Sequence, residues 1–217
     1  MTYFREAQEI KVEVFGKQFV MRTNDYAYQA DGNATVACGD TILLATAGMG
    51  NARADAGFFP LMVDFQERYS AAGKLKHSRV NKREGRPSDQ AILNSRMIDR
   101  PIRPLFPKGM VNDVQLIISP LAFDKTHEMS AMGITAASLA LVLSGMPFDG
   151  PAAGVRMGLI NGELVVNPTI DELESSSLDL VVAGTANAIT MVESRADEVA
   201  FDKMLEALEM AFEAIQK

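Results

Sequence analysis

The sequence has few cysteines and histidines, the residues that form disulfides and most zinc sites. Cys38 is the only cysteine among 217 residues, so no intrachain disulfide can form, as is usual in a reducing cytoplasm. Cys38 lies in an apolar strand pattern, where a small buried side chain is expected rather than a nucleophile. The two histidines, His77 and His127, have no partner at the spacing of zinc ligands. We therefore expect a cytoplasmic protein without a zinc site.

Long apolar runs are also missing. No run is long enough to cross a membrane, and the first residues, M-T-Y-F-R-E-A-Q-E, contain no apolar core of a secretory signal. We expect no membrane partner. The hydrophobic fraction of 47% still suffices for a sizeable core, and no break in composition marks a boundary. The sequence thus predicts a single domain over residues 1–217.

Alternating and apolar segments predict two groups of strands, separated by helices. Hairpin turns are expected at Gly16-Lys17, Gly39-Asp40 and Asn161-Gly162. The predicted strands cover residues 11–15, 18–22, 35–38, 41–47, 61–65, 114–119, 153–160, 163–166, 178–183 and 188–193. Strands, helix, strands and helix in this order predict an α+β fold with a two-layer arrangement.

Three helices are predicted. The first begins after Ser88, a typical N-cap, and ends at Arg100, because Pro101 disfavours helical geometry at the residue before it. Residues 128–143 are apolar on most faces and should form a central buried helix. The last helix begins at about Asp197. The stripe expected to pack on the sheet is Phe201, Met204, Leu205, Leu208, Phe212 and Ile215.

Residues 68–108, the basic segment, concentrate the positive charge of an acidic chain. They hold 11 of the 21 Lys and Arg residues but three acids, a formal charge of +8, whereas the remainder carries −15. A local positive field on an acidic chain indicates a polyanion site. The segment begins as a loop and continues into the first helix.

Three arginines of the basic segment lie on stiff backbone. Arg96 and Arg100 belong to the predicted helix, and Arg103 lies between two prolines, which suits bidentate phosphate contacts. The lysines and arginines before them lie on a loop that could capture a single strand. The alternative is a set of solvated charges, with Asp99 pairing Arg96 or Arg103 within the fold.

Several motifs, in order along nearly the whole chain, carry a family resemblance. They are F-F-P-L-M-V-D-F-Q-E-R at 58–68, A-A-G-K at 71–74, K-R-E-G-R-P-S at 82–88, I-D-R-P-I-R-P-L-F-P at 98–107, L-S-G-M-P-F-D-G-P at 143–151, V-V-N-P-T at 165–169 and L-D-L-V-V-A-G-T at 178–185. Together they closely resemble the first RNase PH-type domain of bacterial polynucleotide phosphorylases. The resemblance implies the RNase PH fold, a β-α-β-α arrangement whose topology is related to that of a ribosomal-protein-like domain.

The resemblance also implies a function. The family degrades single-stranded RNA from the 3′ end with inorganic phosphate as the attacking group, requires Mg²⁺, and assembles as a homotrimer that can join RNA-degradation machinery. Its catalytic residues belong to a second RNase PH-type domain, while the first domain contributes RNA-binding residues. The matching positions here are Lys82, Arg83, Arg86, Arg96, Arg100 and Arg103. No role in DNA binding is implied.

The catalytic positions of an active RNase PH-type domain are altered in this chain. Where the active type has a serine run before the buried helix, only Ser130 remains, and Glu128 would repel phosphate there. Of two metal-binding aspartates, Asp179 is present, but Leu173 replaces the other. One carboxylate cannot hold Mg²⁺ as a pair does. We therefore predict no catalytic or metal-binding residue in this chain.

Two departures from the family pattern concern RNA contacts, and two other functions remain open. Val80-Asn81 replaces a pair of phenylalanines that can stack on bases, and Tyr28 replaces an arginine. One alternative is a stand-alone inactive RNase PH-type subunit that binds RNA or supports a ring, as in exosomes. Another is a catalytically competent RNase PH, against which Leu173 and the missing serine run argue.

Overall fold

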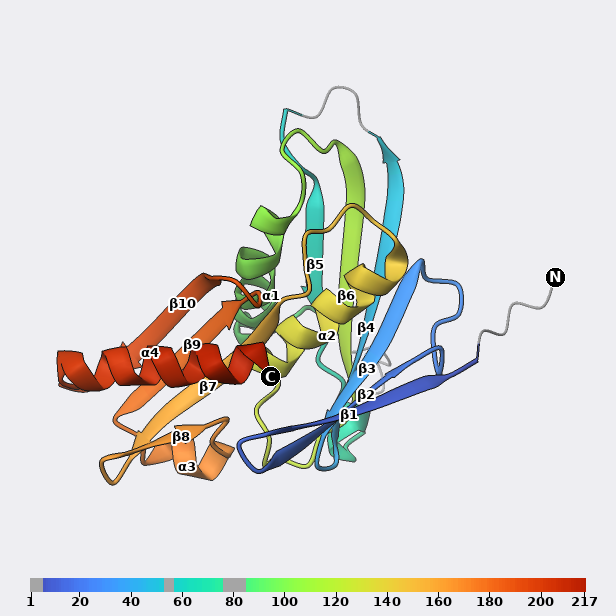
Figure 1. Ribbon diagram of the computed structural model, residues 1–217. Coiled ribbons are helices and arrows are strands. Elements are labelled where there is room, and N and C mark those ends of the chain that lie inside the picture. The colour runs from blue at the N-terminus through green and yellow to red at the C-terminus, as the bar shows by residue number, and fades with distance from the viewer. Residues whose placement is uncertain (1–5, 53–56, 76–84) are drawn as a thin grey trace.

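The computed structural model of this chain describes residues 6–52, 57–75 and 85–217 and contains two β-sheets and four α-helices within them (Figure 1). The elements are β1 (Gln8–Val14), β2 (Lys17–Thr23), β3 (Gly32–Cys38), β4 (Thr41–Ala52), β5 (Leu61–Phe65), η1 (Tyr69–Ala72), α1 (Asp89–Ile102), η2 (Arg103–Leu105), β6 (Asn112–Ala122), α2 (Met129–Ser144), β7 (Ala153–Ile160), β8 (Glu163–Val166), α3 (Ile170–Glu174), β9 (Leu178–Gly184), β10 (Ile189–Ala196) and α4 (Phe201–Gln216). In these ranges, no helix is both long and apolar enough to cross a lipid bilayer.

The strands form a six-stranded and a four-stranded sheet. Their orders are β1-β2-β3-β4-β6-β5 and β10-β9-β7-β8, and the β5–β6 pair is parallel, whereas the other pairs are antiparallel. The hairpins at Gly39-Asp40 and Asn161-Gly162 are confirmed. The first turn is shifted by one residue from the prediction. It is centred on Phe15-Gly16, because both have positive φ, and Val14 pairs with Lys17.

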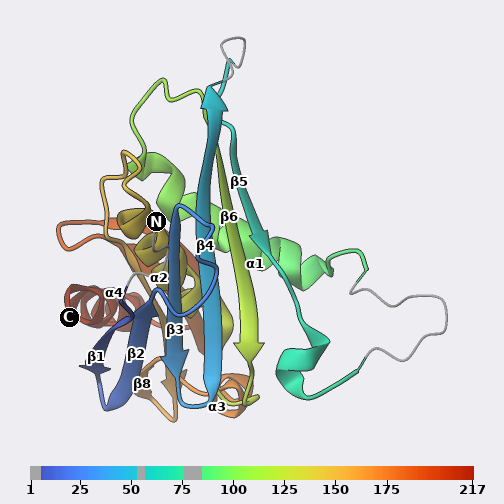
Figure 2. The same ribbon diagram turned by 90° about the vertical axis from the view of Figure 1, so that its right-hand side faces the viewer.

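Helices and sheets alternate in space, as the predicted β-α-β-α arrangement requires. Helices α1 and α2 lie between the two sheets, and α4 covers the far side of the smaller sheet (Figures 1 and 2). Strand β9 shows both faces of that sheet in use. Val181 and Ala183 belong to the core cluster that contains α2, while the alternating Leu180 and Val182 pack with α4. The layers are therefore, in order, the six-stranded sheet, α1 with α2, the four-stranded sheet and α4.

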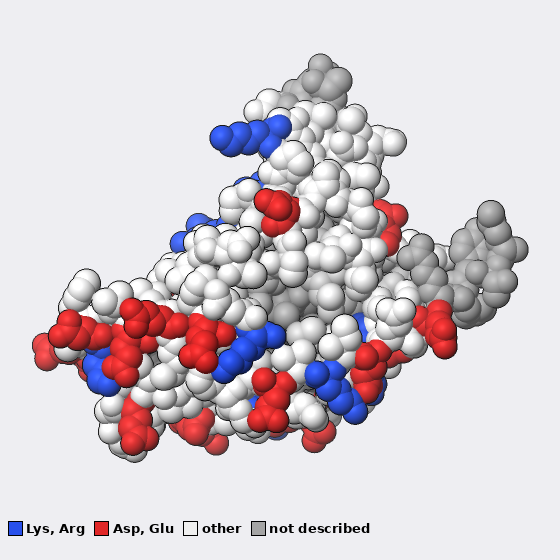
Figure 3. Space-filling view, viewed as in Figure 1, with Lys and Arg blue, Asp and Glu red and all other residues white. Residues whose placement is uncertain are grey.

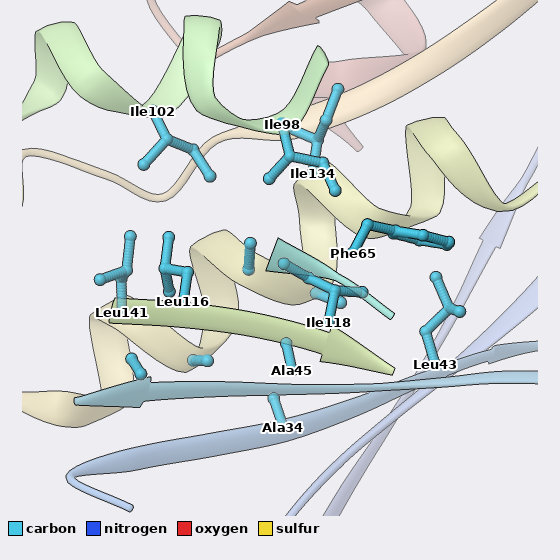
Figure 4. Packing of buried hydrophobic residues seen from close by; sticks show 14 of the residues in the cluster. Ala34, Leu43, Ala45, Phe65, Ile98, Ile102, Leu116, Ile118, Ile134 and Leu141 are labelled. Carbon is cyan, nitrogen blue, oxygen red and sulfur yellow. The ribbon is translucent and has the colours of Figure 1, made fainter. Parts of the chain in front are cut away.

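Helix α2 is the centre of this packing, as predicted. Ile134 and Leu141 are fully buried and face the core that Phe65 and Ile98 complete (Figure 4). The helix ends at Gly145, whose left-handed backbone (φ 75°) forms the C-cap. A Cβ atom on Gly133 would lie 2.8 Å from Ile98 Cδ1, so glycine permits the close approach of α1 and α2. Most of α2 before Val142 is enclosed by protein, which explains its nearly continuous apolar sequence.

Helix α4 begins later than predicted and buries part of the predicted stripe. Glu198 has a left-handed backbone (φ 48°), which delays the first helical turn until Phe201. Phe201 and Leu205 are exposed, at 79% and 48%, although they belonged to the predicted stripe. Of the predicted stripe, Ile215 is buried and Met204 and Leu208 pack against the same cluster. The other buried residues are Ala207, Ala211 and Ala214, and these small side chains allow the helix to lie close to the sheet.

Helix α1 begins as predicted but continues past its expected end. Ser88 is the N-cap, and its hydroxyl accepts a hydrogen bond from the Ala91 N–H. The helix includes Pro101 and ends at Ile102, both of which are buried, so packing outweighs the local preference at Arg100. The Arg103 N–H still bonds the Asp99 carbonyl, so the helical turn is complete without the missing proline donor.

Asp124 connects the β3–β4 turn to the loop that leads into α2. Its carboxylate accepts bonds from Thr41 Oγ1 (2.8 Å), from the N–H groups of Thr126 (2.7 Å) and His127 (3.0 Å), and from His127 Nδ1 (2.6 Å). Burial alone raises the pKa of Asp124, but these hydrogen bonds outweigh it and hold the pKa well below its usual range.

We expect Asp124→Asn to destabilise the fold by about 1–2 kcal/mol at neutral pH, because charge-assisted bonds are lost. Since the folded pKa is depressed, this stabilisation is present above the ordinary carboxyl pKa of about 4 and is lost as pH falls toward the folded value. Thermal unfolding between pH 7 and pH 3 measures it. The difference between Asp124→Asn and wild type should shrink at low pH. An exposed-site control, Asp171→Asn, should show a much smaller difference throughout.

Candidate nucleic-acid interface

The exposed face of α1 presents the three arginines that the sequence indicated. Arg96 and Arg100 are one turn apart on the helix, and Arg103 follows at its end, so their spacing places all three on one side. All three are exposed. Ile98 and Ile102, on the opposite side, are fully buried in the core and fix the rotation of the helix. The stiff backbone predicted for these arginines is therefore present, although as continuous helix rather than as a helix end.

Arg103 is held by bonds within the protein. Its guanidinium donates to Asp99 Oδ2 (3.0 Å) and Oδ1 (2.7 Å), and to the carbonyl oxygens of Phe59 (3.1 Å) and Leu61 (3.1 Å). It also lies 5.8 Å from the centre of the Phe59 ring. Four of these contacts are hydrogen bonds, and a guanidinium has five N–H groups, so little capacity remains for another ligand. The alternative prediction, that Asp99 pairs with Arg103, is confirmed.

The other predicted RNA-binding residues differ in the ion pairs and hydrogen bonds that they form within the protein. Arg100 pairs with Glu193 of β10 at 2.6 Å, but both side chains are about half exposed, and such pairs contribute little. Arg86 and Arg96 are exposed and form no hydrogen bond or ion pair with the described residues. Lys82 and Arg83 lie outside the described residues, as do Val80 and Asn81. Among the cations of this group that the structure describes, Arg86 and Arg96 are thus the most available to an anion.

The head of α2, where the sequence resemblance predicts the altered phosphate-binding position, is closed by a carboxylate. Glu128 is the N-cap, and its Oε2 accepts bonds from the Ser130 N–H (2.8 Å) and the Ser130 hydroxyl (2.6 Å). A helix N-terminus attracts anions through its free N–H groups and dipole. Glu128 already supplies that anion, so the predicted repulsion of phosphate has a structural basis.

Arg156 of β7 joins the two remaining carboxylates of this position. Its Nε and Nη2 donate to the two oxygens of Asp179 at 2.7 Å each, and its Nη1 lies 3.0 Å from Glu128 Oε2. The Arg156 side chain is 18% exposed. Burial lowers the pKa of Arg156, but its hydrogen bonds with Asp179 and the charge of Glu128 raise it further above its ordinary value. The cluster is an internal salt bridge between two sheet strands and a helix.

This arrangement does not fit a metal ion. Both oxygens of Asp179 and one oxygen of Glu128 face a guanidinium, which occupies the side from which a cation would be bound. Within the described ranges, no group of three His, Cys, Asp or Glu side chains could hold a metal. Leu173 lies in α3, a short helix that Thr169 caps through a capping box with Glu172. The sequence did not point to Arg156, because its partners are 23 or more residues away.

Sequence profiles of known families match two adjacent stretches of the chain. Residues 16–147 match domain 1 of the 3′ exoribonuclease family, and residues 150–214 match domain 2. The chain belongs to the 3′ exoribonuclease family. The family to which the motifs pointed is thereby confirmed.

Curated relatives place this family member more narrowly. It is 48% identical over 206 residues to the polyribonucleotide nucleotidyltransferase of Halothermothrix orenii, covering 95% of this chain and 29% of the relative. The enzymes of Thermus thermophilus (47%, 97% and 30%) and Macrococcus caseolyticus (46%, 98% and 30%) are similar. The chain thus spans about 30% of the length of these relatives.

A solved structure shows that the fold is shared. Rrp46 from rice (Oryza sativa) superposes with a TM-score of 0.71 at 15% identity, covering 97% of this chain and 89% of that one. Both family stretches therefore lie within the extent of one known chain. At this identity the likeness concerns the RNase PH fold alone.

Proposed function

We propose that this chain is the first, non-catalytic RNase PH-type unit of a phosphorolytic 3′-to-5′ exoribonuclease, and that it binds and guides single-stranded RNA. The observation that carries the proposal is the guanidinium of Arg156 between Glu128 and Asp179. It satisfies the carboxylates at the position where phosphate and a cation would have to bind. Catalysis by this unit would require that salt bridge to be broken first.

The relatives support the enzymatic part of the proposal. Three of them carry the name polyribonucleotide nucleotidyltransferase and are about three times as long as this chain. Inorganic phosphate and Mg²⁺ would act in a second RNase PH-type unit outside the 217 residues. We further propose that residues 1–217 act as one unit, since one core cluster includes residues of both sheets. A cytoplasmic homotrimer is the expected assembly of the whole protein.

The RNA-binding part rests on the exposed arginines. The proposed set is the one predicted from the sequence, Lys82, Arg83, Arg86, Arg96, Arg100 and Arg103, in which Arg103 is less available because it donates four hydrogen bonds within the protein. Arg86 and Arg96 are the leading members, because they are exposed and have no partner among the described residues. The part of the molecule around α4 would repel a polyanion, because acidic side chains gather along this helix (Figure 3). RNA would therefore approach from the side of α1.

The test is the salt dependence of RNA binding by an Arg96→Asp variant. We expect affinity for a single-stranded oligoribonucleotide to fall about ten-fold, and the slope of log affinity against log salt to fall by about 0.7 for one lost phosphate contact. Arg96 is preferred to Arg103 because replacing Arg103 would also remove bonds to Asp99 and two carbonyl groups.

Lys125→Asp is the matched control, since Lys125 is an exposed cation outside the basic segment. It should leave both affinity and slope nearly unchanged. If Lys125→Asp and Arg96→Asp had equal effects, RNA attraction would be general and the proposed path along α1 would be wrong. No binding by the wild-type protein would remove the RNA-guiding function altogether.

A further inference from the structure

A cavity of about 490 Å³ lies between the end of β5, the turn η1 and the start of α1. Figure 2 shows these three segments on its right-hand side, where β5 forms the edge of the larger sheet. The residues that matter for its chemistry are Asp64, Gln66, Glu67, Arg68, Tyr69 and Arg86. Its volume is within the range of small-molecule sites, about 300–1,000 Å³. The closed catalytic position at Arg156 does not share any of these residues.

One wall of the cavity is fixed by hydrogen bonds. The Gln66 N–H bonds the Ile118 carbonyl (2.8 Å), and the Gln66 side chain accepts from Arg68 (2.8 Å) and Ser119 (3.2 Å). The turn η1 is tied to β6, because the Phe123 N–H bonds the Ala71 carbonyl at 2.9 Å. Tyr69, at the start of η1, is therefore held on a rigid support, although its side chain is 45% exposed.

The opposite wall is fixed by the start of α1. Arg86 is followed by Pro87 and by Ser88, which caps the helix with a bond of 3.1 Å to the Ala91 N–H. The Arg86 side chain is exposed and has no bond to the described residues. Two rigid walls lower the conformational entropy that a ligand would have to restrict on binding.

The lining calls for a ligand with three kinds of group. A free guanidinium suits a phosphate, since arginine binds it with two parallel hydrogen bonds. The Tyr69 ring offers a face on which a base can stack. The carboxylates of Asp64 and Glu67 cannot receive an anion but accept bonds from hydroxyl or amino groups. A ribonucleotide carries a phosphate, a flat base and hydroxyl donors in one unit.

We propose that this cavity is a ribonucleotide subsite, in which Arg86 holds the phosphate, Tyr69 stacks on the base and Glu67 accepts from ribose hydroxyls. It rests on the proposed RNA-guiding function and places one nucleotide of the strand beside α1. The stacking partner would be Tyr69, so the subsite does not require the phenylalanine pair that Val80 and Asn81 replace. A free nucleoside monophosphate offers the same chemistry as a nucleotide within a strand.

Binding of a ten-residue oligoadenylate and of AMP, measured by calorimetry, tests the subsite. Tyr69→Leu should weaken oligoadenylate binding by about 5- to 150-fold, the size expected for one lost stacking contact. Tyr69→Phe keeps the ring and should bind like wild type. Tyr26→Leu is the matched control, because Tyr26 is similarly exposed, at 51%, but lies outside the cavity. Thermal melts identify any variant that fails to fold.

The outcomes separate this inference from the function on which it rests. Loss of affinity with Tyr69→Leu but not with Tyr69→Phe or Tyr26→Leu supports the subsite. AMP binding that depends on Tyr69 assigns it to free nucleotides as well, whereas oligoadenylate binding alone assigns it to the strand. If Arg96→Asp weakens RNA binding while Tyr69→Leu does not, the subsite is wrong and the RNA-guiding function stands. If inorganic phosphate displaces AMP from wild type and Tyr69→Leu equally, the cavity is only an anion site.

Discussion

Replacing Ala137 with aspartate should destabilise the protein by about 3–5 kcal/mol or prevent folding. Ala137 lies in α2 and is fully buried. This helix contacts both sheets, so no movement of the side chain could bring the new carboxylate to water. An unpaired charge in such a site has lost its hydration without gaining a partner. Urea denaturation monitored by circular dichroism measures the change.

Val142→Asp on the same helix is the matched control for that prediction. Its side chain is 45% exposed, so the carboxylate remains in water. A small loss is expected, because a negative charge near the end of a helix is unfavourable by a few tenths of a kcal/mol. Equal losses for the two variants would show that α2 is not the centre of the core.

Removing the guanidinium of Arg156 should destabilise the protein by about 2–4 kcal/mol. Arg156→Met keeps most of the apolar length of the side chain but leaves Glu128 and Asp179 without their cation. Breaking a buried ion pair on one side costs about 3–5 kcal/mol, and the partial exposure of these groups reduces that value. Adding Glu128→Gln and Asp179→Asn removes the unpaired charges and should recover most of the loss.

Arg195→Met is the control, because Arg195 lies in β10 of the same sheet, separated from β7 by β9, and is exposed. It should change the free energy of unfolding by less than about 0.5 kcal/mol. An Arg156→Met protein as stable as Arg195→Met would mean that the salt bridge is not maintained in solution. The carboxylates at the head of α2 would then be open to other ligands.

Much of the fold could be predicted because its signals are local. The hairpin at Asn161-Gly162 needs two residues with positive φ, and those residue types adopt it readily. Helix α2 is apolar on all sides, which predicts a helix surrounded by protein. The packed face of α4 could be predicted only in part, since the burial of the alanines at 207, 211 and 214 depends on how closely the helix lies to the sheet. The end of α1 depends on burial of Pro101, which is also a tertiary effect.

The candidate site divides in the same way. The basic segment and the missing serine run are visible in the order of residues, so an RNA path and an absence of catalysis can be hypothesised from the sequence, and both stay predictions. Arg156 was missed because it meets Asp179 only through the pairing of β7 with β9. Likewise, the bonds of Arg103 to the Phe59 and Leu61 carbonyls depend on how α1 packs beside β5. Such contacts need the three-dimensional structure.

The measurement that tests the closed catalytic position most directly is the release of nucleoside diphosphates from RNA by the purified 217-residue chain in the presence of phosphate and Mg²⁺. We predict no release above the background without protein, because Arg156 occupies the carboxylates that a cation would need. An active polyribonucleotide nucleotidyltransferase assayed in parallel shows that the conditions support phosphorolysis. Measurable release by the 217-residue chain, abolished by Asp179→Asn in a variant that remains folded, would contradict this account.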